Sequence, residues 1–435
     1  MPLRCSRVVV LALSATLIRA ADPAIDQILI RLEKLEAENA ALREEVKRLR
    51  ERLEPGTGPP IEERVAVQEQ RIEEQQQTKV ESSERVPVKF TGTILFNAFS
   101  AGRNGGPGEF PTVATQGRGP MQIRGTMQQT SFGFEVESPS PVFGAHARGH
   151  VLMDFYAEYE DYFVPRIRVA SMELNWKNQT LRAGIEKPIV APRNPVSLAQ
   201  VVYPALWGAG NLWLWEPMAS IEQRFHAGET EFRAQAGIFQ TDDARVGGQA
   251  GFAPTNLQPR PGWQGRFQIG RRWDDQRAIE IAPGFHYSRT LVASTSAPSQ
   301  LATADWLFGP SKWWEISGAL FHGRNAAPLG GLRQGVIVLA PGSVRAVRTT
   351  GGWTQLLLRP LPRLRLHAMA GQQNDNDRDL PRGGIGRNLS WAMNGIVQLS
   401  PNVLLGLELQ QIRTTYIGSG TRVLNRYDVA LAYTF

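Results

Sequence analysis

The chain has 435 residues, a formal net charge of +7 and one cysteine, Cys5. The single cysteine excludes a disulfide framework and a cysteine-based zinc site, and no apolar run is long enough for a polytopic helical membrane protein. The many turn-forming residues (42 Gly, 29 Pro) and aromatic residues (11 Trp, 18 Phe, 8 Tyr) indicate numerous strands separated by turns.

Residues 1–20 have the layout of a secretory signal peptide. Arg4 and Arg7 precede a short apolar run at 8–18, and Ala20 offers a small-residue cleavage site. The apolar run is too short to span a bilayer. We therefore expect the rest of the chain to leave the cytoplasm. The alternative is an uncleaved helical anchor.

Residues 21–54 carry a heptad repeat in which every a and d position except Asn39 is apolar. A sustained repeat of 3.5 residues predicts a coiled coil, and opposite charges at paired g and e positions favour a parallel one. Arg31, Leu32, Leu35 and Glu36 resemble the pattern of short trimeric coiled coils, so we expect a homotrimer. The alternative is a single amphipathic helix on a surface. The residues expected to mediate oligomerisation are Arg31, Leu32, Leu35, Glu36, Asn39, Leu42, Val46 and Leu49.

Residues 55–85 begin with a Pro- and Gly-rich stretch, which ends the helix, and continue as a polar segment. We interpret them as a linker or tether.

Residues 86–435 alternate between apolar and polar side chains. In 427–435 every odd position is large and apolar, and every even position is small or polar. This period of two predicts strands with one apolar and one wet face. We expect sixteen strands, near residues 88–101, 128–138, 142–160, 165–177, 179–187, 217–227, 229–240, 262–274, 276–292, 297–309, 312–325, 351–360, 362–374, 387–400, 402–416 and 423–435.

The connections between these strands alternate between short turns and mostly longer loops, which is the plan of a transmembrane β-barrel. The expected fold is therefore all-β: a 16-stranded antiparallel transmembrane β-barrel with an N-terminal α-helical coiled coil. An even number of strands puts both ends of the barrel at the short-turn rim, so the coiled coil would lie in the periplasm. The alternative is a large soluble β-sandwich or β-helix.

A barrel of this size encloses an aqueous channel. The long connection at about 188–216 is rich in Pro and Trp, and we expect it to fold inward as a constriction. The alternative is that it packs over the rim or against a neighbouring subunit.

The charged residues fall on the same alternate positions as the other polar residues of each strand, so they should face the lumen. Arginine binds anions with a permanently charged planar fork, so mild anion selectivity is expected. The alternative is that these arginines pair with the acidic residues and only fill space along the wall. The residues expected to line the pore or its constriction are Arg148, Arg166, Arg168, Arg182, Arg193, Arg224, Arg233, Arg266, Glu135, Glu186 and Glu222.

The sequence offers little support for other chemistry. It has no metal-ligand or catalytic pattern and suggests no cofactor, and its basic residues are too dispersed for nucleic-acid binding. Residues 375–379 resemble part of a calcium loop but lack its glycine and terminal glutamate. We expect neither an enzyme nor a nucleic-acid-binding protein.

The overall plan resembles the DcaP-like trimeric porins of Gram-negative outer membranes. The resemblance is carried by residues 89–96, 130–134 and 181–186, together with the terminal Phe435. It implies a homotrimer in contact with outer-membrane lipid and lipopolysaccharide, and passive uptake of small anionic or polar solutes such as dicarboxylates. The alternative function is a structural outer-membrane anchor whose periplasmic coiled coil tethers the envelope, with peptidoglycan as its candidate partner.

Overall fold

The computed structural model describes residues 38–45, 47, 87–106, 108–159, 162–240, 261–292 and 295–435. The chain divides into two compact units, Met1–Ser83 and Glu84–Phe435. In the first unit, residues 38–45 and 47 are helical, and they include Asn39 and Leu42 of the expected coiled coil. The expected signal peptide, the linker up to residue 85 and the other oligomerisation residues lie outside the described residues. Among the residues that are described, no helix is long and apolar enough to cross a membrane.

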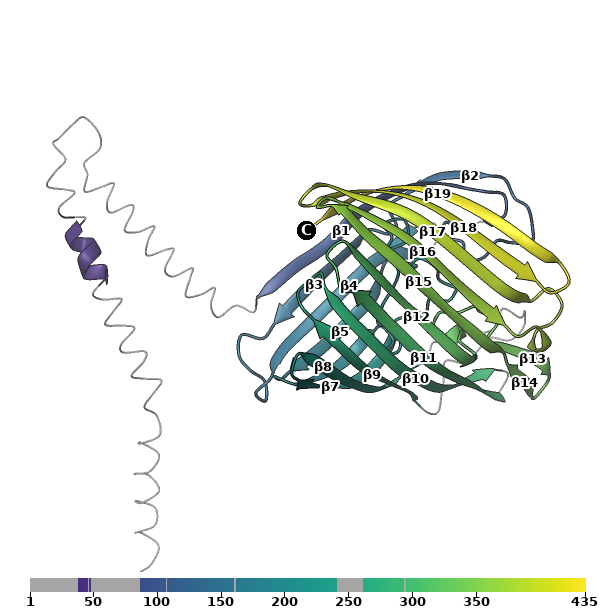
Figure 1. Cartoon of the computed structure of the whole chain (residues 1–435), viewed down its shortest axis with the longest axis horizontal. Helices are drawn as coiled ribbons and strands as arrows, with labels where there is room; N and C mark the ends of the chain where they lie inside the picture. The colour runs from purple at the N-terminus through teal and green to yellow at the C-terminus, as the bar shows by residue number, and fades with distance from the viewer. Residues whose placement is uncertain are drawn as a thin grey trace, which may run out of the picture. The chain divides into compact units, whose positions relative to one another are not determined.

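The second unit is a ring of antiparallel strands (Figure 1). Seventeen strands of its described residues form one sheet, and because β2 (Gln122–Thr126) is a short strand beside β1, the closed ring has sixteen. The ring runs through β1 (Val88–Ala101), β3 (Ser131–Glu137), β4 (His146–Tyr159), β5 (Tyr162–Asn175), β6 (Gln179–Glu186), β7 (Glu216–Ala227), β8 (Thr230–Phe239), β9 (Gly262–Arg272), β10 (Ala278–Val292), β11 (Thr295–Gly309), β12 (Trp314–Arg324), β15 (Arg348–Leu361), β16 (Leu364–Asp375), β17 (Ile385–Ser400), β18 (Val403–Tyr416) and β19 (Gly420–Thr434).

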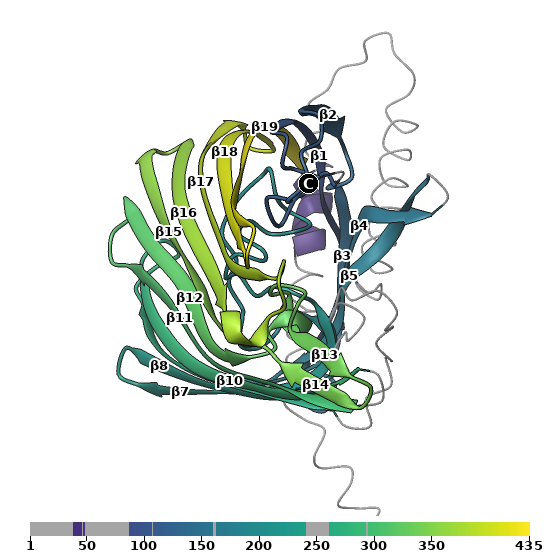
Figure 2. The ribbon, with the colours of Figure 1, turned by 90° about the vertical axis from the view of Figure 1, so that its right-hand side faces the viewer.

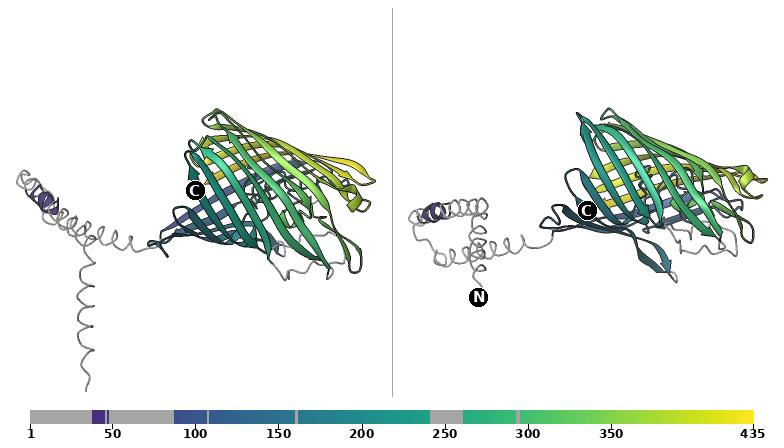
Figure 3. Two further views of the ribbon diagram at one scale, coloured as in Figure 1. Left: turned by 60° about the horizontal axis from the view of Figure 1, so that its bottom comes forward. Right: turned by 90° about the horizontal axis from the view of Figure 1, so that it is seen from below.

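The ring closes where β1 pairs with β19. The register runs from Thr93 opposite Thr434 to Ala101 opposite Arg426. Closure satisfies the backbone groups of both terminal strands and leaves no sheet edge, which is required of a barrel in lipid. The strands run obliquely around the ring, as the two views of Figure 3 show.

The sixteen-strand plan expected from the sequence is confirmed, with three local differences. The strand expected at 128–138 is β3, and the short strand β2 is additional, because it lies in the connection expected before it; β2 and β3 pair with opposite halves of β1. The strand expected at 142–160 begins at His146, because Phe143 and Gly144 adopt positive φ in a turn and end the pairing. The loop after β12 contains a small hairpin that the sequence did not predict, β13 (Val336–Ala340) and β14 (Ser343–Ala346).

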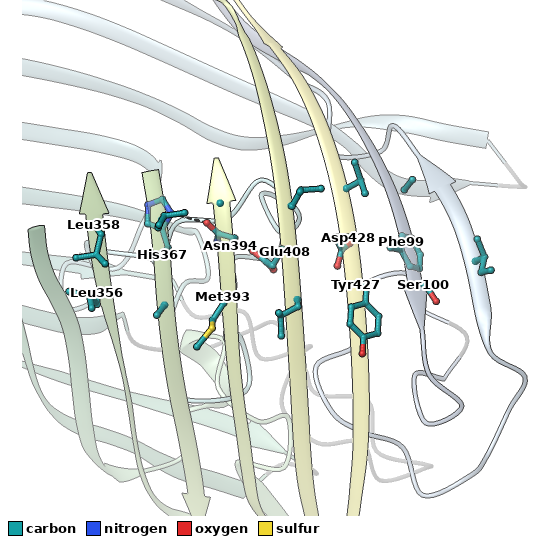
Figure 4. Close-up of a pocket in the computed structure, with 18 residues that line it drawn as sticks. Phe99, Ser100, Leu356, Leu358, His367, Met393, Asn394, Glu408, Tyr427 and Asp428 are labelled. Carbon is teal, nitrogen blue, oxygen red and sulfur yellow. Dashed lines mark hydrogen bonds between the residues drawn. The ribbon is translucent and has the colours of Figure 1, made fainter. Parts of the chain in front are cut away.

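The two faces of the barrel wall differ in polarity. Figure 4 shows part of the wall, where the outward-facing Met393 and Tyr427 alternate along their strands with the polar Asn394 and Asp428. A shallow cavity of about 790 Å³ spans β15–β19 and β1, and its lining is dominated by outward-facing side chains such as Leu409. This hollow therefore belongs to the outer apolar surface and not to the lumen.

An ion pair fixes the connection between β16 and β17, which contains the 3₁₀ turn η3 (Asp377–Asp379). The guanidinium of Arg348 donates Nε–H to Asp379 Oδ2 at 2.8 Å and Nη2–H to Oδ1 at 3.1 Å, and its backbone N–H also donates to Oδ2. The hydrogen bond from Arg348 holds the pKa of Asp379 below its usual range. The pair therefore stabilises this connection only while the carboxylate is ionised.

This linkage predicts a pH-dependent effect of Asp379→Asn. Because the folded-state pKa is lowered, the stabilisation is present above the unfolded pKa of about 4 and is lost as pH falls through the folded value. At pH 6, amides of residues 376–384 should exchange hydrogen several-fold faster in the variant than in the parent, and near pH 2 the two proteins should match. Asp377→Asn is the control, since that carboxylate makes none of these bonds. Equal exchange at pH 6 would contradict the prediction.

Candidate functional site

The segment 188–216, which connects β6 to the first residue of β7, crosses the barrel interior. Val190 N–H donates to Gln264 of β9 at 3.4 Å, and Val196 N–H donates to Gln355 of β15 at 2.7 Å. Asn97 of β1 donates to the carbonyl of Leu198 at 3.0 Å. Because β9, β15 and β1 lie far apart around the closed ring, a segment that bonds to all three must pass through it. Figure 2 looks into the ring and shows loop segments inside.

The apolar residues of this segment pack on inward-facing apolar residues of the wall. Leu198 and Val201 contact a cluster formed by Leu95, Ala430 and Ala432. Ala205 and Leu206 pack in the same way against the inner side of β15, β16 and β17. The apolar content that singled out this loop in the sequence therefore builds a core within the barrel, on the side of β15–β19 and β1.

An aromatic row connects the segment to the β4–β5 hairpin. The ring of Tyr203 lies 4.7 Å from that of Tyr156 on β4 and 4.4 Å from that of Trp207. The rings of Trp213 and Trp215 follow at 5.2 Å from each other. Arg168 of β5 stacks over the Trp215 ring at 4.3 Å, a cation–π geometry. The segment is thus held at both walls of the barrel.

Each expected pore-lining arginine contacts an acidic side chain. The alternative derived from the sequence, that the arginines pair with acidic residues, therefore describes the geometry. The pairs are Arg148–Glu135 at 2.5 Å, Arg166–Asp154 at 2.9 Å, Arg168–Asp154 at 3.4 Å, Arg182–Glu173 at 2.6 Å, Arg224–Glu222 at 2.6 Å, Arg233–Glu231 at 2.8 Å, Arg266–Asp305 at 2.7 Å, and Arg193 with both Asp305 at 3.0 Å and Glu280. Glu186 accepts a hydrogen bond from Ser171 at 2.5 Å.

Asp154 is shared by two of these arginines. Its side chain is 0% exposed, and Arg166 binds it through two parallel hydrogen bonds of 3.1 and 2.9 Å. Arg168 is its second partner, so one carboxylate faces two guanidinium groups. The cluster carries one surplus positive charge beside Tyr156 and Trp215, at the place where the segment meets the wall.

The lumen is open mainly along the charged wall. The side chains of Arg182, Arg224 and Arg233, on β6–β8, are 32%, 32% and 31% exposed. On the opposite wall, the inward-facing His367, Asn394 and Glu408 are only 3%, 7% and 6% exposed. The segment 188–216 covers that opposite wall. The inward-facing arginines of β6–β8 are therefore more accessible than the inward-facing residues of β16–β18.

Sequence reasoning did not nominate Asp154, Asp305 or Tyr203. Asp154 shares the inward parity of Arg148 on the same strand, and that signal could have identified it. Within the described residues, no group of three or more His, Cys, Asp or Glu side chains could hold a metal ion.

The fold and the lumen together define a porin-type β-barrel. No protein-family model and no curated protein matches the sequence. Among solved structures, the chain is similar to the outer membrane channel DcaP of Acinetobacter baumannii, with 15% identity over 80% of this chain and 97% of that chain and a TM-score of 0.67. It is also similar to an anion-selective porin from Comamonas acidovorans, with 11% identity over 81% of this chain and all of that chain (100%) and a TM-score of 0.55. The chain therefore has the fold of outer-membrane channels of the DcaP type.

Proposed function

We propose that this protein is an outer-membrane porin through which small polar or anionic solutes diffuse passively. The observation that carries the proposal is the geometry of the interior. A closed sixteen-strand ring contains the segment 188–216, which covers one wall and leaves the arginines of β6–β8 accessible. Opposed fixed charges in a narrow low-dielectric passage focus the electrostatic potential and orient polar solutes. Weak contacts at several sites permit transit.

The ion pairs limit the selectivity that this wall can produce. Because most of the arginines are neutralised, the wall presents a row of dipoles together with the surplus positive charge at Asp154. This arrangement favours a mild anion preference and transit of compact dicarboxylate-like solutes. In the proposed orientation, the long loops face the outside, and the barrel contacts outer-membrane lipid and lipopolysaccharide.

The direct test is planar-bilayer recording of the refolded protein, with the reversal potential measured in a salt gradient. We expect channels that open in groups of three and a reversal potential with a modest bias towards anions. A folded trimer without conductance would exclude the porin. It would then favour the alternative of an envelope anchor held by the coiled coil.

We further propose that the N-terminal coiled coil trimerises the barrel from the periplasmic side. Changing Leu35 and Leu42 together to Asp puts three pairs of charges into the apolar seam, so the trimer should dissociate at concentrations at least tenfold higher than the parent does. Light scattering in detergent measures this dissociation. Lys47→Asp, at an outer heptad position, is the control and should have little effect. An undiminished trimer in the double variant would show that the barrel associates without the helix.

A further inference from the structure

A second cavity lies at the end of the barrel where the long loops gather. Its volume is about 430 Å³, and its walls come from three separate loops and the start of β17. We call it the mouth cavity and define it by Phe110, Thr112, Trp207, Trp213 and Arg333. Its size is that of pockets that hold small organic molecules, which are mostly apolar with a few polar groups.

The walls of the mouth cavity are fixed in place. Asn388 of β17 donates hydrogen bonds of 2.9 Å to the carbonyls of both Thr112 and Gly208, which ties two of the loops together. The backbone N–H of Trp213 donates to the carbonyl of Leu329 at 3.0 Å, which ties in the third. The cavity is thus preformed, so a ligand would lose little affinity to ordering of the loops.

Two hydrogen-bond donors of the mouth cavity, the Arg333 guanidinium and the Trp207 indole, have no acceptor among the described residues. Arg333 makes no ion pair or hydrogen bond with any described residue, whereas each arginine nominated in the lumen pairs with an acid. The indole Nε1 of Trp207 is enclosed and has no acceptor either. None of the described residues that line the cavity is acidic. Arg333 is exposed, so its guanidinium is accessible to a ligand, and beside the aromatic walls it suits an anionic group attached to an apolar body.

We propose that the mouth cavity binds organic carboxylates that carry an aromatic or other apolar body, before they enter the passage along β3–β8. The carboxylate pairs with Arg333, and the apolar body lies between Phe110, Trp207 and Trp213. This inference rests on the proposed porin function and refines its substrate class. It separates such solutes from compact dicarboxylates, which have no apolar part to fill the aromatic walls.

Single-channel recording tests this proposal with three probes of matched size or charge. The anion 3-phenylpropionate, added on the long-loop side, should interrupt the current at a frequency that rises with its concentration. Propionate lacks the ring, and phenethylammonium has the opposite charge. At the same concentration, each should interrupt the current at least about tenfold less often, because each lacks one of the two contacts. Equal interruption by propionate would overturn the proposal.

Two variants locate the effect. Arg333→Gln should reduce interruptions by 3-phenylpropionate about tenfold, since it removes the only charge in the described lining. Arg387→Gln is the matched control: it removes the same charge near the same rim, but from the outer face, because the neighbouring Asn388 points inward. An unchanged response in Arg333→Gln would contradict the assignment.

Equilibrium dialysis of labelled 3-phenylpropionate against the detergent-solubilised trimer separates the two proposals. Saturable binding that Arg333→Gln abolishes, in a protein that does not conduct, would reject the porin and retain the cavity. Conducting channels that bind none of the probe would retain the porin and reject the cavity.

Discussion

Asp154→Asn is expected to raise the preference of the channel for anions over cations by at least about fivefold. Asp154 forms ion pairs with both Arg166 and Arg168, so its neutralisation removes the shared partner of two guanidinium charges at the level of the segment 188–216. One added charge about 7 Å from a passing ion, at an effective dielectric constant of about 50, changes the energy by about 1 kcal/mol, which corresponds to about fivefold. The reversal potential in a salt gradient measures this change.

The same variant should also be less stable. Removal of one partner from a buried ion pair costs about 3 kcal/mol or more, because the remaining charges lose their counter-ion. Thermal unfolding in detergent measures this loss. Asp274→Asn is the control for charge: Asp274 pairs with Arg277 in the turn between β9 and β10, outside the passage. If Asp154→Asn leaves the reversal potential unchanged, the passage does not run past this cluster.

Gly371→Leu is expected to lower the single-channel conductance by about half or more, because the close-packed interior can accommodate a new side chain only by moving the segment 188–216. Gly371 faces inward on β16, and a Cβ atom there would lie 2.3 Å from the carbonyl oxygen of Ala209. The added side chain therefore pushes this part of the segment away from its wall and towards β3–β8. Conductance in a fixed salt concentration measures the effect.

Gly395→Leu provides the matched control on the neighbouring strand. Gly395 faces outward, and its nearest neighbour to an added Cβ, Leu366 Cδ2, is at an ordinary 3.4 Å. Its conductance should equal that of the parent. A rise in conductance in Gly371→Leu would show that the segment does not narrow the passage at this level.

The strands could be predicted well from the sequence because one face of a barrel wall meets lipid and the other meets the lumen. Apolar and polar side chains must therefore alternate strictly along each strand. In 427–435 the large odd residues and small or polar even ones indicate the second half of β19, and the expected strand at 423–435 begins three residues after β19 does and ends one residue after it. The alternation of short and long connections then set the antiparallel order. The inward course of 188–216 was proposed from its Trp and Pro content, and its hydrogen bonds to β1, β9 and β15 show where it runs.

The partners of the charged residues could not be predicted in the same way. Whether a residue is at an odd or an even position along a strand gives the face on which its side chain lies. Its partner depends on the register between neighbouring strands, and that register changes at β-bulges. Between β4 and β5 the register shifts twice near Asp154, which brings Arg166 and Arg168 to one carboxylate. The β13–β14 hairpin was missed for a related reason. Its two strands form a sheet separate from the barrel, so they do not show the alternation of apolar and polar residues that marks the barrel strands.

The attachment of the segment 188–216 to the wall has an evolutionary consequence. Asn97 and Asn394 donate to its carbonyls, and Gln355 accepts from one of its amides. These hydrogen bonds connect the segment 188–216 to opposite parts of the barrel wall. A change in the length of the segment or of a strand would therefore leave buried polar groups on the other without a partner. Descendants of this chain can alter the bore only through coordinated substitutions. We expect residues of the segment to covary with inward positions of β1, β15 and β17 rather than with each other.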